Sequence, residues 1–218
     1  KLRQFGVQEA NIVEIVRSIT KYAVMVNNPE DIAYHLDKAF YLAFEGRKGP
    51  VWIDVPMDVQ GSFIIPDNLK RFRYKKKEIK IPDFTNLSKI FKTSKRPIIL
   101  AGNGIRLSSA HKELKHFSEK YNIPIVTTFL ATDVVDHYSS LNLGVVGVKG
   151  TRAANFAMQN CDLLIAVGTR LSVPVTGYIY NYFARDAKIV VIDIDPEEHK
   201  KILLKSIHFT NAMLNYFC

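Results

Sequence analysis

The sequence predicts an α/β protein in which a partial α/β unit precedes a doubly wound parallel sheet. Short apolar runs, such as residues 51–55 and 97–101, alternate with stretches of helical periodicity, which is typical of parallel strands connected by helices. A strongly basic segment separates the last strand of the first unit from the first strand of the second. The 218 residues are enough for two small domains, each with its own core.

The first unit is expected to end with a helix and a buried strand. Asn28 suits the N-cap of a helix, and Pro29 suits its first turn. Apolar residues then recur at helical spacing over residues 32–44, which predicts one apolar helix face. The run 51–55 is typical of a strand inside a parallel sheet. We place the end of this domain at residue 61, so its range is 1–61.

A basic linker is expected over residues 62–82. Residues 70–80 contain seven lysines and arginines and one glutamate, and they account for +6 of the formal net charge of +9. A phosphate-binding stripe is usually spread over a folded face, whereas this charge lies in one segment with Pro66 and Pro82 at its flanks. The pattern favours a solvated linker, and we expect no nucleic-acid partner.

Residues 83–218 are expected to form the second domain. Its alternating strands and helices imply right-handed crossovers and a parallel sheet covered on both faces. Ligands of such a sheet lie beyond the carboxyl ends of its strands. The expected strands are 97–101, 124–127, 162–167 and 188–194, and the expected helices are 84–91, 110–121 with Ser108 or Ser109 as its cap, and 151–159.

Small and polar residues follow the predicted strands. Glycine lets a backbone approach closely, a helix N-terminus offers N–H groups to phosphate, and a carboxylate after a strand can hold ribose hydroxyls. This set is typical of a dinucleotide site, but tight turns need glycine in any case, and Leu107 stands where the usual fingerprint has its third glycine. Nucleotide binding and plain turn chemistry both remain open. The segments are Gly102-Asn103-Gly104, Thr127-Thr128, Lys149-Gly150-Thr151, Gly168-Thr169-Arg170 and Asp193-Ile194-Asp195.

The sequence shows no self-contained catalytic group. His111 and His116 lie five apart on one predicted helix, so their imidazoles do not stack as metal ligands would. Asp133, Asp136 and His137 could be drawn as an acid/base group, but they fall in a loop-like stretch where such residues are common. We therefore name no catalytic residue and no metal ligand in this chain.

The number of cysteines and the length of the apolar runs restrict the class of protein. Two cysteines, Cys161 and Cys218, are too few for a disulfide framework or a four-ligand metal set, which favours a reducing cytoplasm. No apolar run approaches the roughly 18 residues that span a bilayer, so we expect no membrane partner. The chain opens at Lys1 in mid-pattern, and we expect it to be a piece of a longer protein.

Four separated motifs carry a resemblance to a known family. They are GVQEANIVEIVRSITKYAVMVNNPEDI, GRKGPVWIDVPMDVQ, GTRAANFAMQNCDLLIAVGTRL and FARDAKIVVIDIDPEE. In this order they closely resemble thiamine diphosphate-dependent enzymes of the acetolactate synthase type, over nearly the whole chain. The resemblance implies that residues 1–61 end a pyrimidine-binding domain and that residues 83–218 form a Rossmann-like central domain.

The resemblance also implies an activity and cofactors. Such enzymes decarboxylate a 2-oxo acid and join the product to a second carbonyl compound, with thiamine diphosphate and Mg²⁺, and their active sites lie between subunits, so we expect a homo-oligomer. The family's cofactor-activating glutamate is expected upstream of Lys1, and its Gly-Asp-Gly metal and diphosphate motif downstream of Cys218. The chain alone is therefore expected to be inactive.

The resemblance assigns site residues as well. Gln8 matches a substrate-facing position, whereas the neighbouring aromatic position is Val7, a family lysine is Met57 and a family arginine is Pro174. Losing these two cations would suit a carbonyl acceptor without a carboxylate. FAD, which some members carry, is a possible further cofactor. The residues assigned to cofactor binding are Gly102, Gly104, Gly150, Thr151, Gly168, Arg170 and Asp193.

Two other interpretations remain open. The chain could be a non-catalytic module that binds a FAD-type nucleotide with the central fold alone. It could also be a structural module whose nucleotide site is vestigial.

Overall fold

The computed structural model describes residues 6, 9–74, 83–200 and 206–210. The chain divides into two compact units, Lys1–Lys77 and Glu78–Cys218, and the division falls inside the predicted linker 62–82. The domain boundaries at 61 and 83 stay predictions.

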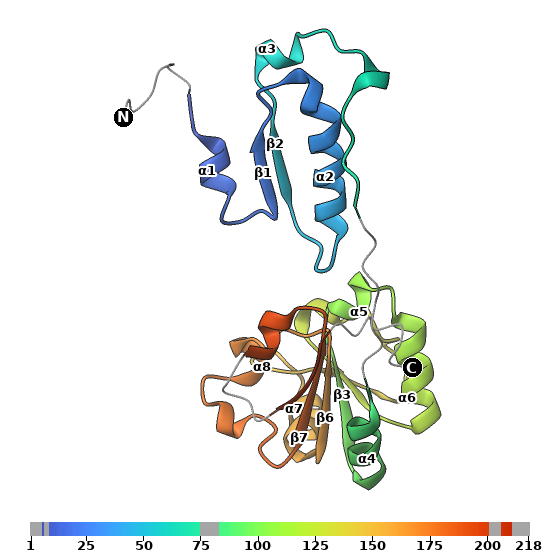
Figure 1. The fold of residues 1–218 in the computed structure, drawn as a ribbon. Helices are drawn as coiled ribbons and strands as arrows, with labels where there is room; N and C mark the ends of the chain where they lie inside the picture. The colour runs from blue at the N-terminus through green and yellow to red at the C-terminus, as the bar shows by residue number, and fades with distance from the viewer. Residues whose placement is uncertain (1–5, 7–8, 75–82, 201–205, 211–218) are drawn as a thin grey trace. The chain divides into compact units, whose positions relative to one another are not determined.

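The first unit is built around two parallel strands, with Tyr22 opposite Val51 and Met25 opposite Asp54. Helix α2 lies against this pair and α1 lies on the other side (Figure 1). The predicted helix and strand are both present. In chain order, the elements are α1 (Ile12–Val16), β1 (Tyr22–Met25), η1 (Pro29–Asp31), α2 (Ile32–Phe44), β2 (Val51–Asp54), α3 (Met57–Gln60) and η2 (Pro66–Asn68).

The start of the long helix α2 differs from the prediction. The Asn28 side chain accepts a hydrogen bond from the Glu30 amide at 3.2 Å, but it caps the preceding turn η1, and the N-cap residue of α2 is Asp31, which makes no side-chain cap bond. At the other end, Lys21 Nζ donates to the Glu45 carbonyl at 2.5 Å and to the Arg47 carbonyl at 3.0 Å. A cation here interacts favourably with the negative end of the helix dipole.

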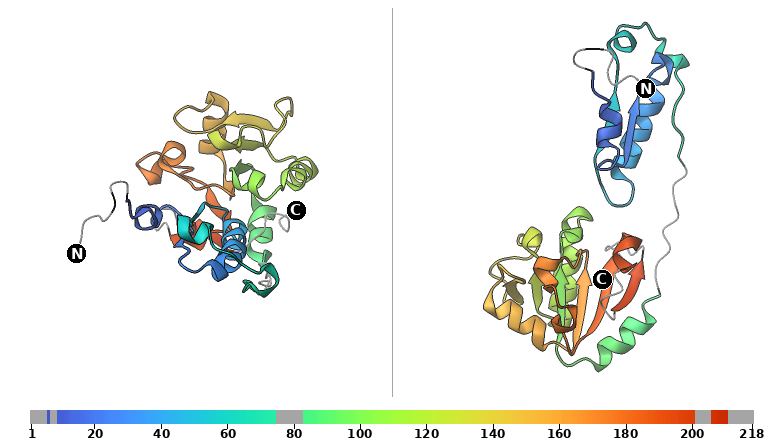
Figure 2. Two further views of the ribbon diagram at one scale, coloured as in Figure 1. Left: turned by 90° about the horizontal axis from the view of Figure 1, so that it is seen from above. Right: turned by 90° about the vertical axis from the view of Figure 1, so that its left-hand side faces the viewer.

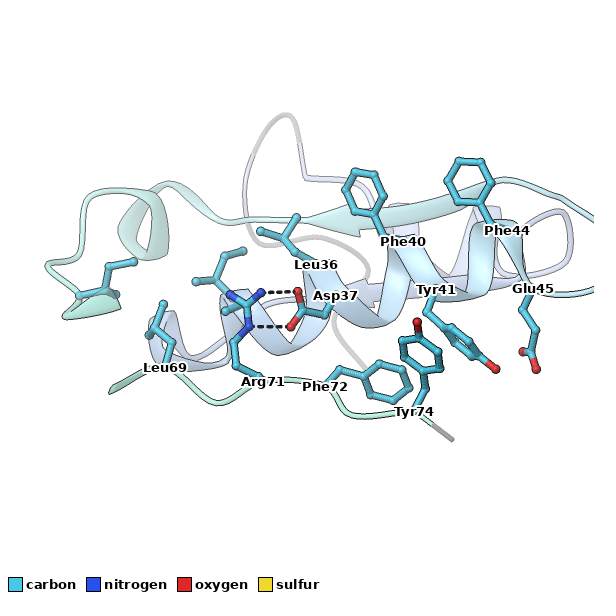
Figure 3. A pocket seen from close by; sticks show the side chains of 13 residues that line it. Leu36, Asp37, Phe40, Tyr41, Phe44, Glu45, Leu69, Arg71, Phe72 and Tyr74 are labelled. Atoms are coloured by element: carbon cyan, nitrogen blue, oxygen red, sulfur yellow. Dashed lines mark hydrogen bonds and ion pairs between the residues drawn. The ribbon is translucent and has the colours of Figure 1, made fainter. Parts of the chain in front are cut away.

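The segment 69–74, called the α2 strap below, lies along α2 (Figure 3). Its Arg71 forms two bonds with the Asp37 carboxylate, Nη2 to Oδ1 at 2.9 Å and Nε to Oδ2 at 2.8 Å. The Tyr74 ring stacks on the Tyr41 ring with centroids 4.4 Å apart. This part of the predicted linker is therefore packed against the first unit rather than surrounded by solvent.

Replacing Phe72 of the strap with alanine is expected to destabilise the first unit by about 2 kcal/mol. The Phe72 ring lies 5.6 Å from the Tyr34 ring and 5.7 Å from the Tyr41 ring, centroid to centroid, and this packing would be lost. Denaturant unfolding followed by fluorescence of Trp52, the only tryptophan of the chain, measures the effect. The matched control is Phe63→Ala, because the Phe63 side chain is fully exposed; equal losses in the two variants would contradict the prediction.

The second unit is a doubly wound α/β domain, as the sequence predicts. Its sheet has the strand order β5-β4-β3-β6-β7-β8, and every described pair is parallel (Figures 1 and 2). Its strands are β3 (Pro97–Ala101), β4 (Ile125–Thr127), β5 (Asn142–Val145), β6 (Leu163–Val167), β7 (Lys188–Asp193) and β8 (Ser206–Thr210). The connecting elements are α4 (Thr85–Thr93), α5 (Gly104–Leu107), α6 (His111–Tyr121), η3 (Phe129–Ala131), α7 (Arg152–Asn160), α8 (Val173–Thr176), η4 (Tyr180–Tyr182) and η5 (Pro196–Lys200).

Alternate residues of the strands enter two cores, one on each face of this sheet. Leu87 of α4 and Leu114 of α6 pack with one set, which includes Ile99. Met158 of α7 packs with the opposite set, which includes Leu100. Strands that are buried on both faces have continuous apolar sequences, which is why these runs were visible in the sequence.

The connection after β3 differs from the prediction. We expected Ser108 or Ser109 to cap the following helix, but α6 begins at His111 with Ala110 as its N-cap. Ser108 Oγ instead donates to the Gly104 carbonyl at 2.8 Å, within the short helix α5 that the sequence did not predict. Ser108 therefore forms its hydrogen bond at the end of α5 and does not cap the start of α6.

The strand order creates a switch point between β3 and β6. The chain leaves β3 to build β4 and β5 on one side, and then returns to place β6 directly against the other side of β3. The connections that follow β3 and β6 therefore run in opposite directions. Ligands of open α/β sheets bind at the carboxyl edge beside such a point.

Candidate functional site

Three glycines join the turns that follow β3 and β6. Gly102 N–H donates to the Val167 carbonyl, and Gly104 N–H donates to the Gly168 carbonyl, both at 2.9 Å. We call Gly102, Gly104 and Gly168 the glycine joint. It lies at the carboxyl edge of the second sheet, at the switch point.

Only glycine fits at the joint. A Cβ atom on Gly102 would lie 2.2 Å from the Gly168 carbonyl oxygen, and one on Gly104 would lie 2.6 Å from the Gly168 Cα. Gly168 also has a φ of +57°, in the left-handed region. The two turns thus touch backbone to backbone, and this close packing alone requires the three glycines.

Hydrogen bonds inside the second unit also hold the turn before α7. The Thr151 side chain is the N-cap of α7, where its Oγ1 accepts from the Ala154 amide at 3.2 Å and donates to the Leu143 carbonyl at 3.1 Å. A Cβ atom on Gly150 would lie 2.5 Å from the Val145 carbonyl oxygen. Both residues are therefore explained by local structure.

The main-chain amides of five predicted residues form hydrogen bonds inside the protein. The sequence argument was that such N–H groups could face a phosphate, but all five predicted glycine and threonine positions donate to protein carbonyls at 2.8 to 2.9 Å. The donor and acceptor pairs are Gly102 with Val167, Gly104 with Gly168, Gly150 with Gly147, Thr151 with Val145, and Gly168 with Ile192. Plain turn chemistry, the alternative left open, accounts for these five residues.

The remaining two predicted residues contribute side chains. Arg170 follows β6, its side chain is 71% exposed, and its Nε lies 3.6 Å from Glu198 Oε1. Asp193 ends the neighbouring strand β7, and its Oδ1 accepts from the Asp195 amide at 2.9 Å. An exposed guanidinium and a carboxylate after a strand suit a phosphate and a ribose hydroxyl. Nucleotide binding at this edge would therefore depend on side chains.

The positions that the sequence assigns to substrate binding are Val7, Gln8, Met57 and Pro174. Gln8 and Val7 are outside the described residues. Met57 begins α3 and its side chain is 87% exposed. Pro174 lies in α8, and its carbonyl accepts from the Val148 amide at 3.0 Å.

The acid/base group considered for one loop does not form. The Asp133 carboxylate pairs with Arg106, and Asp136 Oδ1 accepts from the Tyr138 amide at 3.0 Å. Within the described residues there is no group of three or more His, Cys, Asp or Glu side chains that could hold a metal. Burial raises the pKa of the Cys161 thiol to about 12, so this cysteine is not a nucleophile.

A groove also lies on the first unit. Residues of α2 and the strap line it, and Leu36, Phe40 and Phe44 form an exposed apolar row on the side of α2 away from Phe72 and Tyr74 (Figure 3). Its charged pair, Asp37 with Arg71, is already joined. In the part of the chain that the structure describes, no helix is long and apolar enough to cross a membrane.

Two structurally important polar residues were missed from the sequence. Arg106 connects the turns after β3 and β4. Asp162 lies at the opposite, amino edge of the sheet, where it accepts three hydrogen bonds from residues 94–96. No sequence signal identifies either residue, because their partners are distant along the chain.

A comparison with protein families decides the classification. Residues 85–210 match the model of the thiamine pyrophosphate enzyme central domain. The chain belongs to the thiamine pyrophosphate enzyme family. The doubly wound second unit of this family member contains the whole matched range.

Curated relatives of this thiamine pyrophosphate enzyme extend the match into the first unit. A protein named probable acetolactate synthase large subunit, from Methanocaldococcus jannaschii, is 41% identical over 198 residues, covering 88% of this chain and 33% of the relative. The acetolactate synthase large subunit of Corynebacterium glutamicum is 40% identical over 201 residues, covering 89% and 32%. Acetolactate synthase 2 of Nicotiana tabacum is 41% identical over 197 residues, covering 88% and 29%. The chain thus spans about a third of the length of the curated relatives it matches.

Proposed function

We propose that this chain is part of a thiamine diphosphate-dependent, acetolactate synthase-like enzyme that decarboxylates a 2-oxo acid and joins the product to a second carbonyl compound. The observation that carries this proposal is the family match over residues 85–210. The named activity of relatives about 40% identical over most of the chain supports it. The second unit serves such an enzyme as a rigid domain whose turns at the carboxyl edge are tied to one another.

The described residues do not fit thiamine diphosphate and Mg²⁺. They include no cluster of three or more His, Cys, Asp or Glu side chains that could hold a metal, and the sequence has no Gly-Asp-Gly motif. When bound, this cofactor supplies nucleophilic addition to the 2-oxo acid and stabilises the carbanion that remains after carbon dioxide leaves. We propose that polypeptide outside these 218 residues holds it, so that this chain alone is inactive.

A second proposal concerns a FAD-type nucleotide at the carboxyl edge of the second sheet. The exposed Arg170 guanidinium suits a phosphate, and the Asp193 carboxylate, which follows β7, suits ribose hydroxyls. The glycine joint and the turn before α7 would position these two side chains, but their own main-chain amides would not donate hydrogen bonds to the nucleotide. This role is compatible with the enzyme proposal and could also stand alone, as a non-catalytic nucleotide-binding module.

The acceptor is proposed to be a carbonyl compound without a carboxylate. The resemblance implies a lysine and an arginine at the positions of the exposed Met57 and Pro174, and an apolar side chain cannot pair with a carboxylate. The complete reading frame that contains this chain should consume pyruvate, with little acetolactate formed, only when thiamine diphosphate and Mg²⁺ are supplied. Two pyruvates are needed for each acetolactate, so cofactor-dependent acetolactate formation at half the rate of pyruvate consumption would contradict the proposed acceptor.

The double variant Met57→Lys with Pro174→Arg tests the same point in the complete protein. It is expected to raise acetolactate formation at least tenfold, the effect of about one charge-assisted hydrogen bond. The control is Phe63→Lys, which adds a cation at another exposed position of the first unit. No cofactor-dependent consumption of any 2-oxo acid would contradict the enzyme proposal itself. A homo-oligomeric state and a cytoplasmic location are further proposals, from the resemblance and the cysteine count.

A further inference from the structure

We draw no further inference here: the strongest candidate, the groove on the first unit with the exposed apolar row of Leu36, Phe40 and Phe44, carries none because nothing in the described part of the structure shows what covers it.

Discussion

Replacing Gly102 with alanine is expected to lower the free energy of unfolding of the second unit by about 3 kcal/mol or more. The new Cβ atom would lie 2.2 Å from the Gly168 carbonyl oxygen and 2.5 Å from the Thr169 Cα. These are main-chain atoms of a neighbouring turn, so no side-chain rotation can relieve the overlap. Either β3 or β6 must shift, and apart from Pro97 the residues of both strands are buried.

Thermal and denaturant unfolding measured by circular dichroism would report the loss. Gly61→Ala is the control, because a Cβ atom there comes no closer than 3.5 Å to the Met57 carbonyl oxygen. Gly61 has helical backbone angles, so this variant should be neutral or slightly stabilising. Fluorescence of Trp52 in the first unit shows whether the effect of Gly102→Ala is local to the second. A Gly102→Ala variant as stable as the Gly61→Ala variant would show that the joint is not closely packed.

Replacing Asp162 with alanine is expected to cost about 3 kcal/mol. Its carboxylate accepts from Ser94 Oγ at 2.5 Å, from the Lys95 amide at 2.7 Å and from the Arg96 amide at 2.9 Å. These bonds tie the turn before β3 to the start of β6. Removing the carboxylate removes three hydrogen bonds at once, and a hydrogen bond to a charged acceptor contributes about 1.5 kcal/mol or more, less where the donor can bind water instead.

The same carboxylate makes stability depend on pH. Partial burial opposes ionisation, but the hydrogen bonds from Ser94, Lys95 and Arg96 outweigh it and lower the Asp162 pKa to about 2. In an unfolded chain the pKa of an aspartate is about 3.9. A pKa that is lower in the folded state contributes stability above about pH 4, and this contribution of about 2 kcal/mol is lost as the pH falls from about 4 to about 2.

Asp162→Asn removes the negative charge of the side chain and keeps its shape. It should be about 2 kcal/mol less stable than the natural chain at pH 7, and the difference should shrink as the pH falls toward 2. Asp186→Asn is the control, since the Asp186 side chain is 79% exposed and pairs with the adjacent Arg185. A stability difference between the natural chain and Asp162→Asn that stays constant from pH 7 to pH 2 would contradict this account.

The parts of the fold that the sequence predicted are those with a continuous apolar signal. The predicted strands 97–101, 124–127, 162–167 and 188–194 agree with β3, β4, β6 and β7 to within one residue at each end. Strand β5 was not predicted, because Asn142 and Gly144 interrupt its apolar pattern and its pairing with β4 is irregular. The packing of the α2 strap on α2 was not predicted. Its basic residues are typical of a solvated linker, so the aromatic residues among them were not recognised as packing residues.

The assignment of cofactor-binding residues stays a prediction, and the sequence does not reveal the hydrogen bonds that these residues make. The sequence shows that glycines follow β3 and β6, but it does not show that their amides already bind carbonyls of the adjoining turns and strands. Arg106 and Asp162 carry no local signal, since Arg106 pairs with Asp133, 27 residues away, and Asp162 accepts from residues 66 to 68 positions earlier. Contacts of this range depend on the completed topology.

The α2 strap also matters for anyone who separates the two units by recombinant expression. A fragment that stops at residue 61, where the apolar strand signal suggests a natural end, would lack Phe72 and Arg71. The Tyr34 and Tyr41 rings would then face solvent, and the Asp37 carboxylate would lose its arginine. Such a fragment is prone to aggregate, whereas one that extends past Tyr74 retains the aromatic cover of its longest helix.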